Sequence, residues 1–117
     1  MRMTEIDFGA ARPVDGYGPG FFRIGGEVFE GAVLTGTSGT SLWGGYADTV
    51  PLLALAGKVD VIFVGTGAEV AHLPRDFREA LETAGIGVEA MNSPAACRTY
   101  NVLVSEGRRV ALAALTV

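Results

Sequence analysis

The chain has 117 residues, of which 49% are hydrophobic and 19% charged, and a formal net charge of −4. This length fits one domain spanning residues 1–117 with a core of its own, and the composition excludes extensive disorder. A single cysteine and a single histidine exclude a disulfide framework and a conventional His/Cys zinc cage, and the acidic balance argues against nucleic-acid binding. Glycine is unusually frequent: the chain has 17 glycines in 117 residues, about twice the typical share of ~7%.

The beginning of the chain offers no targeting signal that we can identify. The first seven residues carry two acids and no apolar stretch of signal-peptide length, and no run approaches the ~18 apolar residues of a membrane span. The single cysteine, Cys97, has no disulfide partner. We therefore expect a cytoplasmic protein without direct membrane insertion.

The first third of the chain is predicted to be β structure. Met3–Phe8 is a short strand candidate, and residues 16–20 are expected to form a glycine-rich loop. Residues 21–24 and 28–34 flank Gly25-Gly26. This predicts a hairpin, because a type I′ turn needs positive φ at both central residues.

The next segment is harder to assign. Residues 35–47 are rich in Thr, Gly and Ser, and we expect a loop that carries or continues a short strand. Asp48 is expected to cap a short helix over residues 49–56, with Pro51 in its first turn and Gly57 after its end.

In the second half of the chain strands and helices alternate. Strands are predicted at residues 59–64, 86–91 and 109–116, separated by helices that begin at Pro74 and at Ser93. A β-α-β-α-β order favours parallel strands with right-handed crossovers. Together with the antiparallel strands of the first half, this predicts a single α/β domain with a mixed sheet.

Within these helices, specific contacts are expected. Arg78 and Glu82 are spaced as an i,i+4 ion pair on the first helix. On the second helix, Ser93 is expected to be the N-cap, Tyr100 to face the core and Asn101 to lie on the polar side.

Several short blocks occur in an order and spacing that resemble the family of the domain of unknown function 498, also called the Mth938-like domain family. The resemblance covers roughly residues 4–115. The blocks are Gly16-Tyr17-Gly18-Pro19-Gly20-Phe21, Phe29-Glu30-Gly31, Gly65-Thr66-Gly67, Gly85-Ile86-Gly87-Val88-Glu89-Ala90-Met91, Ala95-Ala96-Cys97-Arg98-Thr99-Tyr100-Asn101-Val102-Leu103 and Glu106-Gly107-Arg108-Arg109-Val110.

The resemblance implies a compact single-domain fold with β, β and α layers. The family includes a mitochondrial factor that helps to build the peripheral arm of respiratory complex I and a cytosolic protein linked to adipocyte differentiation. No catalytic residues are established for the family, so the resemblance assigns none to this chain.

Two loops are expected to meet at the carboxyl edge of the parallel strands, where open α/β sheets bind ligands. Gly65-Thr66-Gly67 ends one strand, and Ser93 begins the helix after the next strand. Free N–H groups at the start of that helix, with Cys97 and Arg98 nearby, could hold a carboxylate or a phosphate. The simpler interpretation is that Ser93 only caps the helix and that Cys97 packs in the core.

No arrangement of residues that is typical of catalysis is found. Neither glycine loop matches a dinucleotide fingerprint or a P-loop, the serines lack a nucleophile elbow, and the acids are dispersed. His72 is far from Cys97 in the sequence, so a Cys–His dyad has no support. We therefore predict no catalytic residues, no cofactor and no metal.

Three aromatic residues, Tyr17, Trp43 and Tyr46, lie in glycine-rich segments. They form either a partner surface or a lid over an edge of the core, and the sequence leaves both open. We predict a non-enzymatic accessory or assembly-type protein that acts through contacts with an unidentified protein partner, for example in the assembly of a respiratory complex. The alternative is a small-molecule or anion-binding protein, or an enzyme, that uses the carboxyl-edge notch.

Overall fold

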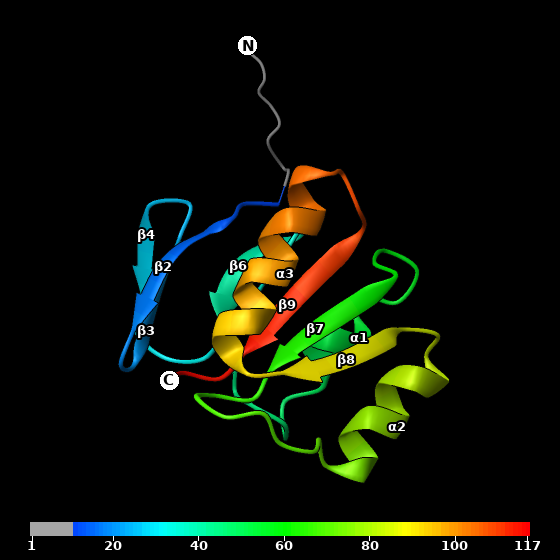
Figure 1. The fold of residues 1–117 in the computed structure, drawn as a ribbon. Coiled ribbons are helices and arrows are strands. Elements are labelled where there is room, and N and C mark those ends of the chain that lie inside the picture. Colours follow the sequence, from blue (N-terminus) through cyan, green and yellow to red (C-terminus); the bar gives the residue numbers. More distant parts are fainter. Residues whose placement is uncertain (1–10) are drawn as a thin grey trace.

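The computed structural model describes residues 11–117, so the predicted strand Met3–Phe8 lies outside the described residues (Figure 1). The described chain forms two sheets. The first is three-stranded and antiparallel, with β2 (Val14–Gly18), β3 (Phe21–Ile24) and β4 (Glu27–Phe29) in that order. The second is five-stranded in the order β6-β5-β9-β7-β8 and contains β5 (Val33–Gly36), β6 (Gly39–Leu42), β7 (Val61–Gly65), β8 (Gly87–Met91) and β9 (Val110–Ala114).

The five-stranded sheet is mixed, as predicted. Strand β7 is parallel to both β8 and β9, whereas β5 is antiparallel to β6 and β9. The connections are α2 (Arg75–Thr83) between β7 and β8, and α3 (Ser93–Ser105) between β8 and β9. Every residue of β9 is buried, because this apolar strand is covered on both faces. The β-α-β-α-β prediction is therefore confirmed.

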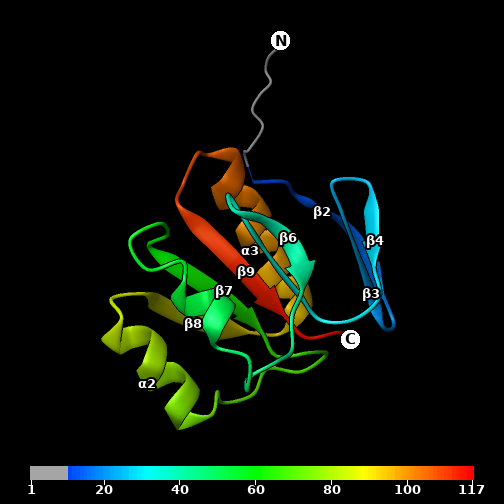
Figure 2. The same ribbon diagram turned by 180° about the vertical axis from the view of Figure 1, so that it is seen from behind.

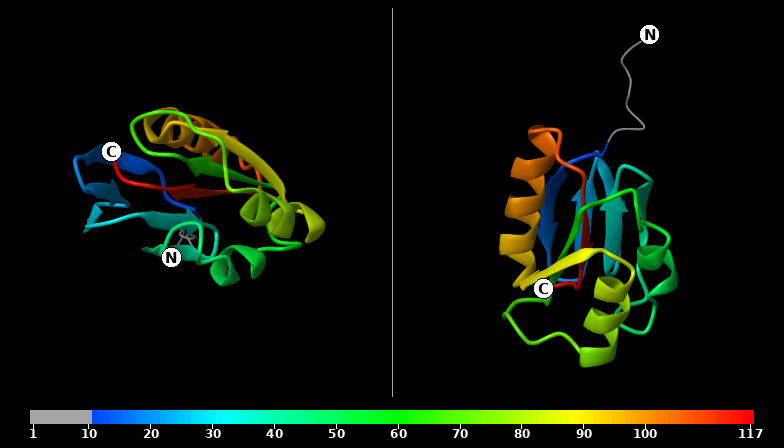
Figure 3. Two further views of the ribbon diagram at one scale, coloured as in Figure 1. Left: turned by 90° about the horizontal axis from the view of Figure 1, so that it is seen from below. Right: turned by 90° about the vertical axis from the view of Figure 1, so that its right-hand side faces the viewer.

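The elements are stacked in layers around the five-stranded sheet (Figures 2 and 3). On one face lie α3 and, beside it, the three-stranded sheet, whose Phe22 and Ile24 join Tyr100 of α3 in one core cluster. On the other face lie α1 (Val50–Leu53) and α2, whose Leu52 and Leu81 belong to a second core cluster. The central sheet thus separates two apolar regions and positions α3 between two β surfaces.

The N-terminal hairpin forms as predicted, but the segments around it differ. Gly25 and Gly26 have φ of 59° and 84°, the left-handed geometry that a type I′ turn needs. Residues 16–20 are not one loop, because residues 14–18 pair with β3 and only the end of this segment turns. The apolar run 28–34 is also divided, since Gly31, at φ 139°, redirects the chain from β4 to β5 in the other sheet.

The start of α1 differs from the prediction. The helix is short, and its N-cap is Thr49, without a side-chain cap bond. The carboxylate of Asp48 instead accepts the Gly44 N–H at 3.0 Å, and its backbone oxygen accepts the Trp43 Nε1–H at 2.9 Å. Asp48 therefore orders the preceding loop and does not cap the helix.

The start of α3 also differs by one residue. Asn92 is the N-cap, and its Oδ1 accepts the Ala95 N–H at 2.8 Å. Ser93 is the first helical residue and is buried. Both residue types cap helices well, so composition alone does not decide between neighbours.

The sequence predicts that Asn101 lies on the polar side of α3, but the structure places it against the three-stranded sheet. Its Oδ1 accepts the Val14 N–H at 2.8 Å, and its Nδ2 donates to the Val14 carbonyl at 2.9 Å. The Tyr100 hydroxyl donates to the Arg12 carbonyl at 3.0 Å. The three-stranded sheet thus gives α3 a second contact surface, which a helix covering a single sheet would not have.

Asn101→Ala should lower the free energy of unfolding by about 1–2 kcal/mol, because two main-chain groups of Val14 lose their partners. The control Arg98→Ala changes an exposed residue on the same helix and should stay within about 0.5 kcal/mol. Urea unfolding of both variants measures the difference. Equal stabilities of the two variants would contradict the role given to Asn101.

Candidate functional site

The structure brings together Gly65, Gly67 and Ser93 at the carboxyl edge of the parallel strands, as the sequence predicts. The Gly67 N–H donates to Ser93 Oγ at 2.9 Å, and the Ser93 N–H donates to the Gly67 carbonyl at 2.7 Å. The Ser93 hydroxyl then donates to the Leu115 carbonyl at 2.6 Å. One buried serine therefore connects the loop after β7, the start of α3 and the residue after β9.

Gly65 explains how closely these segments approach. A Cβ at this position would lie 2.6 Å from Ser93 Oγ and 2.9 Å from Ser93 Cα, too close for any side chain. The Gly65 carbonyl accepts the Leu115 N–H at 2.9 Å. The glycine is needed for packing between the end of β7 and α3.

The N–H groups at the start of α3 already have partners within the chain. Ser93 donates to Gly67, Pro94 has no N–H, and Ala95 and Ala96 donate to the side chain and backbone of Asn92. An anion at this notch would have to displace these bonds. Binding of a carboxylate or phosphate here stays a prediction.

The other predicted notch residues, Thr66, Cys97 and Arg98, lie in three different environments. The Thr66 hydroxyl donates to the Glu69 carbonyl at 2.6 Å within its own loop. Cys97 is buried among core residues, whereas Arg98 is exposed. Burial raises the pKa of the Cys97 thiol to about 11, against a smaller lowering effect of the Arg98 charge. At neutral pH the thiol is protonated and packs as a small apolar group.

The predicted aromatic residues do not share one surface. Trp43 is buried at 5% exposure and lies 6.0 Å, between ring centroids, from both Tyr46 and Phe77 of α2. These residues cover the edge of the core beside α2. Tyr17 lies on the three-stranded sheet, 6.5 Å from the ring of Phe22, and is 41% exposed.

Two of the hollows in the described part of the chain combine segments that are far apart in the sequence, and sequence patterns did not predict them. A cavity of about 280 Å³ lies between the β5–β6 hairpin and α1, with Leu34 and Ser41 on one side and Leu55 and Lys58 on the other. Two glycines of the hairpin, Gly36 and Gly39, also line this cavity.

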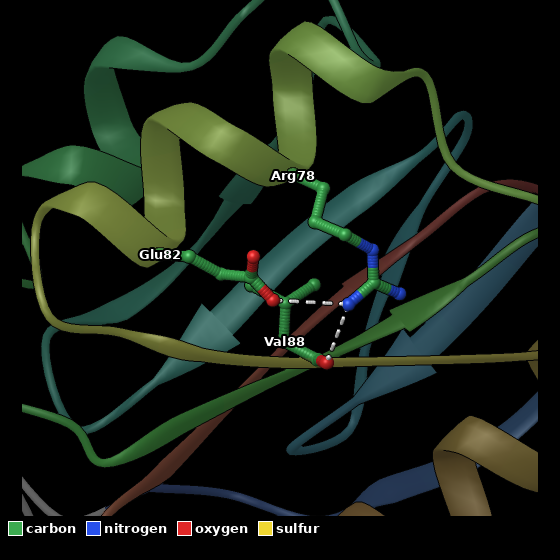
Figure 4. Close-up of polar contacts among 3 residues, drawn as sticks. All are labelled: Arg78, Glu82 and Val88. Atoms are coloured by element: carbon green, nitrogen blue, oxygen red, sulfur yellow. Dashed lines mark hydrogen bonds and ion pairs between the residues drawn. The ribbon is translucent and has the colours of Figure 1, made fainter.

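The second hollow, of about 310 Å³, lies beside α2 and is lined in part by His72 and Arg78. Arg78 reaches from α2 to the neighbouring strand, where its Nη1 donates to the Val88 carbonyl at 3.4 Å and to Glu82 Oε2 at 3.2 Å (Figure 4). The predicted Arg78–Glu82 ion pair is confirmed. The guanidinium of Arg78 also covers the Val88 carbonyl of β8.

The residues that the structure describes, 11–117, were also compared with the requirements of a metal site and of a membrane-spanning helix. In this part of the chain no three His, Cys, Asp or Glu side chains gather as metal ligands would. Over the same residues, the helices are all too short or too polar to cross a bilayer.

Ser93→Ala should cost about 1–3 kcal/mol of unfolding free energy, because it leaves the buried Gly67 N–H and Leu115 carbonyl without their hydroxyl partner. Ser105→Ala removes a hydroxyl that bonds only within an exposed turn and serves as the control. Thermal and urea unfolding compare the two. A Ser93 variant as stable as the control would show that the serine is not a structural connection.

Cys97 should react slowly with a thiol reagent at pH 8 in the native protein and rapidly once the protein is unfolded. Because burial raises its pKa, the Cys97 thiol holds its proton more tightly in the folded protein than in the unfolded chain. The stability that this provides is therefore complete below the pKa of an unfolded cysteine, about 8.5, and is lost as pH rises toward about 11. Rapid labelling of native protein at pH 8 would contradict the buried, protonated thiol.

Comparison with known proteins places the chain in a family. The family model described as "Protein of unknown function (DUF498/DUF598)" matches residues 14–115. An uncharacterised protein of Rhodobacter capsulatus is 48% identical over 115 residues, covering 98% of this chain and 93% of that protein. The NADH dehydrogenase [ubiquinone] 1 alpha subcomplex assembly factor 3 of Danio rerio is 34% identical over 122 residues, covering 98% of this chain and 70% of that protein.

A solved structure agrees with these matches. The crystal structure described as an outer membrane protein from Bartonella henselae superposes with a TM-score of 0.85 at 30% identity, covering 95% of this chain and all of that chain. The shared fold, the match over residues 14–115 and the Rhodobacter relative establish that the chain belongs to the DUF498/DUF598 family, with the Mth938-like fold.

Proposed function

We propose that this protein is a non-enzymatic accessory protein of the assembly type, acting through contacts with a protein partner. The observation that carries the proposal is the match to the zebrafish assembly factor, which extends over 98% of this chain. The similarity therefore includes both sheets and α3, and not one motif. A protein that binds partners needs a stable scaffold and exposed surface, which this domain can supply.

The chemistry of the predicted notch supports the same proposal. The Ser93 hydroxyl accepts a hydrogen bond from the Gly67 N–H and donates one to the Leu115 carbonyl. The Cys97 thiol is buried and protonated at neutral pH. A nucleophile would need a neighbouring base or a lowered pKa. The Ser93 hydroxyl instead connects segments of the fold, and the Cys97 thiol packs in the core.

The name of the zebrafish relative suggests which partner to test first. That relative is named for NADH dehydrogenase [ubiquinone], so the proposed partner is a subunit of a respiratory NADH dehydrogenase during its assembly. The cytoplasm, where such a subunit would be met before it joins the membrane complex, is the proposed compartment.

A complementation experiment tests this function. In Rhodobacter capsulatus, deletion of the 48%-identical relative should lower NADH oxidation by isolated membranes, and expression of this chain should restore it. Succinate oxidation by the same membranes is the control and should not change. A tagged chain at native expression level should also purify with NADH dehydrogenase subunits.

Unchanged NADH oxidation in the deletion strain, together with purification of the tagged chain alone, would contradict the proposal. A metabolite or phosphate that raises the melting temperature by several degrees would favour the alternative, a ligand-binding protein that uses the carboxyl-edge notch.

A further inference from the structure

Three of the four edge strands in the described sheets are protected against pairing with another chain. At the edge formed by β2, Asn101 occupies both main-chain groups of Val14. At the β8 edge, Arg78 covers the Val88 carbonyl and Glu89 is exposed. Strand β4 has three residues and begins with the exposed Glu27. Short strands, charges and covering side chains are the usual ways in which proteins protect sheet edges.

Strand β6 is also short, with four residues, but within residues 11–117 it has neither a charge nor a covering side chain. Its sequence, Gly39-Thr40-Ser41-Leu42, contains no charge and no proline, and Leu42 is 59% exposed. It lies at the outer edge of the five-stranded sheet, at the opposite end of the strand order from β8 (Figure 2). An uncharged open edge is a ready template for an additional strand.

The register shows which main-chain groups face this edge. The Trp43 N–H donates to the Ala32 carbonyl at 2.8 Å, which identifies this pair as hydrogen-bonded. Because hydrogen-bonded and non-hydrogen-bonded pairs alternate in an antiparallel ladder, Thr40 and Leu42 direct their N–H and C=O groups away from β5. The 2.6 Å contact between the hydroxyls of Thr35 and Thr40 fits the closer, non-hydrogen-bonded kind of pair.

Within residues 11–117, these outward groups of Thr40 and Leu42 have no hydrogen-bond partner on the open side. The cavity of about 280 Å³ described above lies along the same strand, between the hairpin and α1. Leu34, Pro51 and Leu55 make its lining largely apolar. An extended segment added to β6 would therefore find both main-chain partners and a place for an apolar side chain.

The charge around this cavity indicates what the segment should carry. Lys58 is exposed and lines the cavity, and none of the lining residues is an acid. The two ion pairs of the described chain, Arg78–Glu82 and Arg109–Asp60, do not involve this lysine. A lysine that lines a cavity without acidic lining residues favours an acidic residue in the ligand.

We propose that the open edge of β6 binds an extended segment of a protein partner as an added strand, with an apolar side chain in the cavity and an acidic residue beside Lys58. The proposal rests on the function proposed above and identifies where the partner docks. In strand addition, main-chain hydrogen bonds provide affinity and side-chain pockets provide specificity. The geometry of Thr40 and Leu42 and the adjoining cavity supply one of each.

A second copy of the chain fits this edge less well. The strand that it would offer is β6 itself, which contains no acidic residue to face Lys58. Four residues span only about 13 Å, and an edge contact of this length buries far less than the roughly 1,200 Å² of a stable interface. A partner segment can extend beyond β6 and choose its side chains freely.

The test uses random peptides displayed in a library and selected on the immobilised full chain. Selected peptides should alternate apolar and polar residues, include an acid, and slow hydrogen exchange at the Thr40 and Leu42 amides. Leu42→Pro removes an outward N–H, and Leu42→Lys places a charge on the edge without altering the ladder. Leu42→Pro should weaken peptide binding by about tenfold or more, because one or two main-chain hydrogen bonds are lost. Leu42→Lys should also weaken binding, because a lysine on an edge strand opposes the addition of another strand.

Two further variants complete the design. Lys58→Glu should weaken the acidic peptides, whereas the control Val28→Lys, which charges a comparably exposed residue on the edge strand β4, should leave binding unchanged. Urea unfolding verifies that each variant remains folded. Binding that is unaffected by both Leu42 variants, or failure to select any extended peptide, would overturn the proposal.

Other occupants of the edge give different results, each of which overturns the proposal. A wild-type dimer in sedimentation that Leu42→Lys converts to monomer would assign the edge to a second copy. Protection of the Thr40 and Leu42 amides in the free monomer would assign it to the chain's own residues. If the natural partner still purifies with Leu42→Lys, the edge proposal fails while the assembly function stands, and absence of a partner from wild type contradicts the function itself.

Discussion

The hydroxyl of Ser93 is the contact on which the arrangement of the layers depends. It joins the loop after β7 to the residue after β9 while the same residue begins α3. The contact is possible only because Gly65 has no side chain at the point of closest approach. From this fixed start α3 runs across the sheet, and at its middle Asn101 and Tyr100 hold the three-stranded sheet in place.

This constraint explains why a site that looks suited to a ligand is used for folding. The carboxyl edge of parallel strands, a glycine loop and a helix start are the usual parts of an anion site. In this chain the Asn92 side chain and the Gly67 carbonyl take the N–H groups that such an anion would need. The surface left for recognition is then the outer edge of the five-stranded sheet, at β6.

The sequence was sufficient for features that depend on local patterns. Gly25-Gly26 predicts its hairpin because few other residues adopt that turn, and the spacing of Arg78 and Glu82 predicts their ion pair. The order of strands and helices in the second half predicts the parallel part of the sheet, because right-handed crossovers leave few alternatives.

The remaining features depend on contacts between distant segments. Asn101 looks like a solvent-facing residue until the three-stranded sheet is placed beside α3, and the pairing of Gly16 with Arg23 makes a strand of a segment that reads as a loop. The cavity beside β6 combines residues from the hairpin and from α1 that share no sequence motif. Neither the edge nor its cavity could be found from spacing alone.

On the proposal made above, this domain contacts its partner at β6 and uses its carboxyl edge for folding. Hydrogen exchange by mass spectrometry, on the chain alone and in the complex purified from the host, tests it most directly. The partner should slow hydrogen exchange in residues 39–42 and leave exchange in residues 65–67 and 93–97 unchanged. Slower exchange confined to residues 65–67 and 93–97 would contradict it.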